Sequence, residues 1–184
     1  MVSSRPRRYI PPHPLLWLAL IAVSLLPMQA TANDVGEYDL KAAFLYNFAV
    51  FTEWPEQAPV GMNVCILGTD PFGSALDHLT RKQVRSVPVV VQRITGTEKI
   101  RGCHVLFIGA SERDRLAQIL DATRTLPVLT VADMKNAAGN GVIIGLVMQE
   151  QRVTFEINVA AARAARLSIS SKLIKLARHV YLPS

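Results

Sequence analysis

The sequence predicts an α/β fold in which a mostly parallel or mixed β-sheet of about five to six strands is flanked by helices on both faces. Short apolar runs of strand length alternate with segments of helical periodicity, which is typical of a parallel sheet with crossover helices. Several runs are apolar at every position, as strands covered on both faces are. The last two runs, joined by a polar turn, predict a hairpin that makes one edge antiparallel.

An aromatic helix is predicted to open this domain. Asp34 and Glu37 have the spacing of a capping box, so the helix should begin there. Aromatic residues then recur at helical spacing: Phe44, Phe48 and Phe51. Pro55 disfavours helical geometry in the residue before it, so the helix should end near Trp54. We expect these aromatic side chains in the core, although a ligand pocket is the alternative.

Six apolar runs are predicted as strands: residues 63–67, 87–91, 105–108, 128–131, 142–147 and 153–157. The turn after the first run should lead into a helix with Asp70 as its N-cap and Pro71 in its first turn.

The remaining helices follow from capping signals and apolar spacing. Ser111–Asp114 forms a second capping-box pattern, which should open a helix with Leu116 and Ile119 on its buried face. Residues 160–165 and 171–180 are predicted as the last two helices, with Leu173 on the buried face of the second.

Residues 1–32 have the pattern of a cleavable secretory signal peptide. Three arginines precede an uncharged apolar run of twelve residues, 15–26, and small residues at 30–32 suit a signal peptidase. The run is shorter than the roughly 20 residues that a transmembrane helix needs. An uncleaved anchor is the alternative. We therefore expect residues 33–184 to form a single domain in the periplasm.

The charge of the mature part excludes one class of partner. Without residues 1–32, seventeen Lys and Arg stand against fourteen Asp and Glu, so the net charge is +3 and not the +6 of the whole chain. This lacks the density of basic residues that a nucleic-acid-binding protein has, so no nucleic-acid partner is expected.

Cys65 and Cys103 are the two cysteines of the chain. In an oxidising compartment an even number suggests one disulfide bond, although two buried thiols remain the alternative. Closing a loop of about 40 residues would stabilise the fold by roughly 4 kcal/mol.

No catalytic motif is complete. The segment from Gly68 to Ser74 resembles half of a phosphate loop but has no lysine after its second glycine. Gly109-Ala110-Ser111 begins a nucleophile elbow, but Arg113 replaces its second glycine. His104 neighbours Cys103 on a predicted strand, so the two side chains should point to opposite faces and not share a metal. No enzyme activity, cofactor or metal is expected.

The C-terminal segment has no acidic residue after Glu156 but carries five basic ones: Arg163, Arg166, Lys172, Lys175 and Arg178. Lys172, Lys175 and Arg178 are spaced to share one helix face. That face is either solvated surface or a docking surface for an acidic protein or anionic headgroups. Glu156 leaves the final strand, where it could orient a partner, and Asn158 can cap the helix that follows.

Several stretches of the chain carry a resemblance that covers nearly all of the mature part: residues 38–48 with 52–55, 65–68 with 70–73, 103–108 with 111–112, 128–131, 155–158 and 169–173. With them the chain resembles the YfiR family. The resemblance implies an α/β periplasmic repressor, with dimers typical, that holds an inner-membrane diguanylate cyclase inactive by binding its periplasmic domain. An outer-membrane lipoprotein can sequester such a repressor, so that cyclic-di-GMP and biofilm formation respond to the state of the envelope.

The chain departs from this resemblance in one respect. The best-known member carries a second cysteine pair in its C-terminal half, where this sequence has no cysteine. Another membrane sensor is an alternative partner. The alternative function is a periplasmic small-ligand-binding or transport accessory protein whose aromatic first helix lines an apolar pocket.

Overall fold

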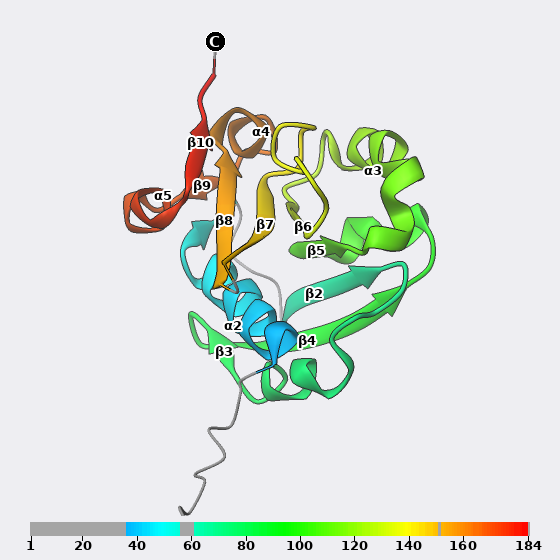
Figure 1. Cartoon of the computed structure of the whole chain (residues 1–184). Coiled ribbons are helices and arrows are strands. Elements are labelled where there is room, and N and C mark those ends of the chain that lie inside the picture. Colours follow the sequence, from blue (N-terminus) through cyan, green and yellow to red (C-terminus); the bar gives the residue numbers. More distant parts are fainter. Residues whose placement is uncertain (1–35, 56–60, 151, 184) are drawn as a thin grey trace, which may run out of the picture. The chain divides into compact units, whose positions relative to one another are not determined.

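An eight-stranded sheet with the order β10-β8-β7-β6-β5-β2-β4-β3 organises the fold (Figure 1). The computed structural model describes residues 36–55, 61–150 and 152–183. The strands are β2 (Met62–Leu67), β3 (Gln83–Val84), β4 (Val87–Ile94), β5 (Val105–Ile108), β6 (Leu129–Ala132), β7 (Ile144–Gln149), β8 (Arg152–Asn158) and β10 (His179–Tyr181). A separate two-stranded sheet pairs β1 (Thr52–Glu53) with β9 (Ser168–Ile169).

The sheet is mixed. The five strands β4, β2, β5, β6 and β7 are mutually parallel, and β8 runs antiparallel to β7 as the predicted hairpin requires. The α/β prediction is confirmed, but the predicted number of five to six strands is wrong because the sheet has eight. The two edge strands missed, β3 and β10, have two and three residues, which is too short for a periodic pattern.

Helices cover both faces of the sheet. They are α2 (Glu37–Val50), α3 (Leu116–Thr123), α4 (Val159–Ala164), α5 (Ser171–Leu176) and three 3-10 segments, η2 (Gly73–His78), η3 (Thr97–Gly102) and η4 (Ala110–Arg115). Alternate residues of β2 point to opposite faces. Val64 and Ile66 join the core beneath α2, whereas Leu67 joins a second core with Ile119 of α3.

Helix α2 begins two residues later than its capping-box pattern predicts. Its N-cap is Gly36, no side chain caps it, and Asp34 lies outside the described residues. The prediction of a core role for the aromatic side chains is confirmed for Phe48, which is fully buried. The rings of Phe44 and Phe48 lie 5.7 and 5.1 Å from the ring of Phe155 in β8. These two rings therefore pack α2 on the sheet and do not line a ligand pocket.

After β2 and after β5 the chain forms 3-10 segments, η2 and η4, where α-helices were predicted to begin. The Asp70 carboxylate accepts a bond of 2.7 Å from the Phe72 N–H ahead of η2, and so does not cap an α-helix. The Ser111 hydroxyl accepts from the Thr69 N–H at 2.9 Å and makes no capping bond. Because it holds the neighbouring loop, Ser111 is unavailable to its own helix, and α3 begins only at Leu116.

The prediction of one helix over residues 171–180 is wrong in its second half. Helix α5 ends at Leu176, and the Arg178 N–H donates to the Phe155 carbonyl at 2.8 Å. Val180 and Tyr181 then pair in parallel with β8. The open edge of β8 offers backbone partners that outweigh the helical pattern, and both residue types favour strands.

Cys65 and Cys103 form a disulfide bond, which confirms that prediction. Their Cα atoms are 5.8 Å apart. This is possible because β2 and β5 are parallel neighbours, and Cys103 lies two residues before the start of β5. The described residues belong to one compact unit, residues 35–184. The predicted signal peptide, residues 1–32, lies outside the described residues.

Candidate partner-binding surface

Successive side chains of strand β8 point to opposite faces of the sheet, one facing the core and the other more accessible to solvent. Phe155 and Ile157 point into the core beneath α2, whereas Glu156 and Asn158 lie on the opposite face and are half-buried. Asn158 caps α4, because its Oδ1 accepts from the Ala161 N–H at 2.8 Å, as predicted. Its amide nitrogen donates to the Ala138 carbonyl at 2.8 Å. Asn158 therefore holds α4 and the loop at Ala138 against β8.

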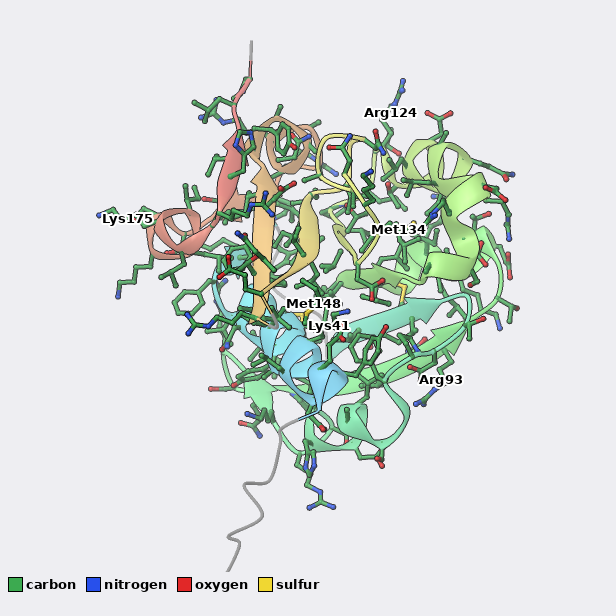
Figure 2. The ribbon with its side chains drawn as sticks, viewed as in Figure 1. Lys41, Arg93, Arg124, Met134, Met148 and Lys175 are labelled. Atoms are coloured by element: carbon green, nitrogen blue, oxygen red, sulfur yellow. A yellow bond between two sulfur atoms is a disulfide. The ribbon has the colours of Figure 1, made fainter. Side chains whose placement is uncertain are left out.

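Glu156 lies at a cleft of about 470 Å³. The cleft is lined by Asp133, Met134, Lys135, Asn136, Leu146, Val147, Met148, Glu156 and Arg178. The Tyr181 hydroxyl lies 3.4 Å from a Glu156 carboxylate oxygen and 3.4 Å from the Asn136 side-chain oxygen. Figure 2 labels Met134 and Met148, which are among the residues that line the cleft. The structure thus brings together Glu156 and Arg178, two of the residues that the sequence suggested.

The cleft exists because β7 continues beyond the end of β6. The two strands pair only at Val131–Ile144 and Ala132–Gly145. The Asn158 N–H donates to the Ile143 carbonyl, which fixes the antiparallel pattern of β7 and β8. In that pattern the backbone groups of Leu146 and Met148 point away from β8, toward the cleft. The wall therefore combines side chains of both charge signs with a strand edge that β6 leaves unpaired.

An ion pair joins the cleft to α2. The Asp133 carboxylate accepts from the Lys41 ammonium at 3.0 Å and from the Tyr38 hydroxyl at 3.3 Å, and Glu37 also pairs with Lys41. The side chains of Lys41 and Asp133 are only 5% and 8% exposed. The second Asp133 oxygen, Oδ1, is buried and has no hydrogen-bond partner among the described residues.

Burial and ion pairing have opposite effects on the pKa of Lys41. Burial alone lowers the pKa of Lys41, but hydrogen bonds to Glu37 and Asp133 outweigh it, and the pKa is raised above its ordinary value. Burial also raises the pKa of Tyr38, and the Asp133 charge adds to that effect. Lys41 therefore stays charged and fixes the start of α2 beside the cleft. Sequence reasoning missed the pair of Lys41 and Asp133, because their contact joins positions 92 residues apart.

Lys172, Lys175 and Arg178 do not share one helix face, so that prediction is wrong. Arg178 lines the cleft, because α5 has already ended. Arg163 belongs to α4 and lines a groove of about 300 Å³ between α4 and α5. Arg166 follows the end of α4, and Lys172 and Lys175 are exposed on α5.

The geometry suits binding by charge and shape. In the part of the chain that the structure describes, no three His, Cys, Asp or Glu side chains are grouped as a metal site. His104 is half-buried, and its Nδ1 accepts from the Asn63 N–H at 3.0 Å, so it is a satisfied structural histidine. Burial lowers its pKa. Of the helices described, none has the length and apolar character to cross a membrane.

Comparison with known proteins adds a family and a fold. A family model described as YfiR/HmsC-like matches residues 38–178. A conserved domain protein of Vibrio cholerae has a similar fold, with a TM-score of 0.50 at 9% identity over 78% of this chain and 60% of that chain. The ABC domain of Streptococcus pneumoniae in complex with L-Trp gives a TM-score of 0.46 at 8% identity over 64% of this chain and 54% of that chain. The chain thus spans less than two thirds of both solved structures.

Proposed function

The chain belongs to the YfiR/HmsC-like family, and on that premise we propose that it represses an inner-membrane diguanylate cyclase by binding the periplasmic domain of that enzyme. The family is periplasmic and regulatory rather than catalytic. Repression of a membrane enzyme from the periplasm requires a surface for a protein partner. A competing outer-membrane lipoprotein, and a homodimer of this chain, are further partners that the family implies.

The observation that carries the proposal is the cleft beside β8. It presents Glu156 and Arg178 together with flexible methionine side chains and the strand edge of β7. Clefts with charges of both signs and adaptable methionines suit the recognition of a protein surface. Glu156 and Arg178 would orient the partner, and Asn158 would act indirectly by holding the cleft wall at Ala138.

The other basic residues would act on the rate of encounter. Arg163, Arg166, Lys172 and Lys175 are exposed and lie in a segment without acidic residues. The positive electrostatic field of these residues attracts an acidic partner over distances of about one Debye length. It therefore changes the association rate more than the dissociation rate.

Binding kinetics with the purified periplasmic domain of the cyclase encoded nearest this gene test the proposal. Glu156→Gln and Arg178→Gln should each speed dissociation and raise the cellular cyclic-di-GMP level. The double reversal Lys172→Glu with Lys175→Glu should slow association at low salt and leave dissociation unchanged. Arg124→Gln is the matched control, because Arg124, the C-cap residue of α3, has a side chain that is 77% exposed, and its ion pair among the described residues is with the exposed Asp121.

Two results would count against the assignment. Unchanged repression in the Glu156→Gln, Arg178→Gln double variant would remove the cleft from the interface. Failure of the wild-type chain to bind the domain, with circular dichroism showing both proteins folded, would direct the search to another membrane sensor.

A further inference from the structure

The two most exposed large apolar side chains of the described residues are Leu176 and Leu182. Each is 72% exposed, whereas the next, Met148, is 43% exposed. Leu176 is the last residue of α5, and Leu182 directly follows β10. A single exposed leucine is ordinary on a protein surface, but two of this exposure within seven residues of chain indicate a contact.

The same segment carries a net positive charge. No acidic residue follows Glu156, and Lys172 and Lys175 are exposed on the helix that ends in Leu176. Figure 2 shows the Lys175 side chain extending from α5 away from the sheet. Exposed leucines and lysines therefore occur together in a segment that has no Asp or Glu side chain.

Residues other than the exposed leucines and lysines hold this surface in place. Leu173, on the inner side of α5, is 3% exposed and belongs to the core beneath α2. The Ser170 hydroxyl caps the helix by accepting from the Lys172 N–H at 3.3 Å. Helix α5 is thus anchored from within, and its outward side chains are available without any rearrangement.

We propose that this segment docks on an anionic phospholipid bilayer. Leu176 and Leu182 insert at the boundary of headgroups and acyl chains, and Lys172 and Lys175 contact the lipid phosphates. A bilayer fits these residues better than a protein partner does, since lysine is depleted in protein interfaces and leucine is seldom a binding hot spot. The inference does not depend on the proposed repression of a cyclase.

Co-sedimentation with vesicles tests the docking. The full chain, recovered from the host with its intact mass determined, is mixed at low salt with vesicles of phosphatidylglycerol and phosphatidylcholine, or of phosphatidylcholine alone. We expect binding to the anionic vesicles only. The partition coefficient should fall about tenfold for Leu176→Ala and for Leu182→Ala. It should fall about fivefold for each of Lys172→Gln and Lys175→Gln.

Matched controls separate this contact from general charge and general apolar surface. Leu40→Ala removes a leucine that is 39% exposed on α2, and Lys99→Gln removes an exposed charge on η3; neither should change vesicle binding. The proposal is overturned if the wild-type chain does not bind anionic vesicles, or if the control substitutions weaken vesicle binding as much as the leucine substitutions do. Loss of a dimer in sedimentation velocity, or of partner binding with vesicle binding unchanged, would assign the leucines to a protein contact instead.

Discussion

Arg166 occupies a backbone position that favours glycine. Its φ is 58°, and it directly follows Ala165, the C-cap of α4. The Arg166 N–H donates to the Arg163 carbonyl and the Leu167 N–H donates to the Ala162 carbonyl. These two bonds form a Schellman motif, in which the left-handed residue is usually glycine. A side chain kept at such a position at a conformational cost points to a role for its charge.

Arg166→Gly is therefore expected to raise the free energy of unfolding by about 0.5–1 kcal/mol, because glycine adopts this conformation without steric cost. Urea denaturation measures the change. Arg163→Gly removes the same charge from within α4 and should instead lower stability by about 1 kcal/mol. Equal effects of the two substitutions would contradict the assigned motif.

His104 gives the domain a pH-dependent stability. Burial holds its pKa below the ordinary value of 6.5, while the unfolded chain keeps that value. Between the two values the unfolded state binds more protons, so stability rises with pH. The contribution is fully present above about pH 6.5 and is lost as the pH falls toward the lower folded value.

Thermal unfolding between pH 5 and pH 8 should show this loss on acidification. In His104→Asn the side-chain oxygen can still accept from the Asn63 N–H, and no imidazole titrates. That variant should have a flatter profile over the same range. An unchanged slope would assign the pH dependence to other groups.

At the scale of elements, long apolar runs were the most predictable parts of the sequence. β5 has the predicted bounds of residues 105–108, and the hairpin of β7 and β8 follows from its alternating pattern. The last helix was predicted four residues too long, because local spacing carries no information on the open edge of β8 that captures residues 179–181. The same limit explains why Arg178 was assigned to a helix face and not to the cleft.

The two leucines of α5 test the orientation of that helix. Leu173→Ala should lower the free energy of unfolding by about 2–4 kcal/mol, since it empties a buried site. Leu176→Ala should change it by less than about 0.5 kcal/mol, because its side chain is in solvent. Guanidinium denaturation of both variants distinguishes them, and similar losses would mean that α5 is rotated.

At the scale of the molecule, the disulfide closes a loop of 38 residues between β2 and the start of β5. Replacing both cysteines by alanine should lower stability by about 4 kcal/mol, since the unfolded chain regains the entropy of that loop. Differential scanning calorimetry measures the loss, and the wild-type protein treated with reductant serves as the comparison. A loss below about 1 kcal/mol would show that the bridge adds little to the packing around it.

The candidate site is a product of the whole fold, and this limits what the sequence could reveal. Glu156 and Arg178 stand out by charge and position, but the cleft also needs Asp133 and Asn136 of the loop after β6 and Met148 of β7. None of these residues belongs to a local motif. Their proximity follows from β7 extending beyond β6, which results from the pairing of whole strands and not from a local residue pattern.

The contacts of α2 also determine the order in which the domain can be completed. This helix is synthesised before the other described elements. Its ion pair cannot form until Asp133, 92 residues after Lys41, has been made, and its aromatic rings cannot contact the sheet residue Phe155 until that residue has been made. Strands β2, β4 and β5 lie close together in sequence and can associate while the chain is still emerging. Until β8 arrives, the rings of Phe44 and Phe48 lack Phe155, their aromatic contact on the sheet. A nascent chain of this protein therefore keeps the part of this aromatic surface that β8 covers open to chaperones until residue 155 has been made.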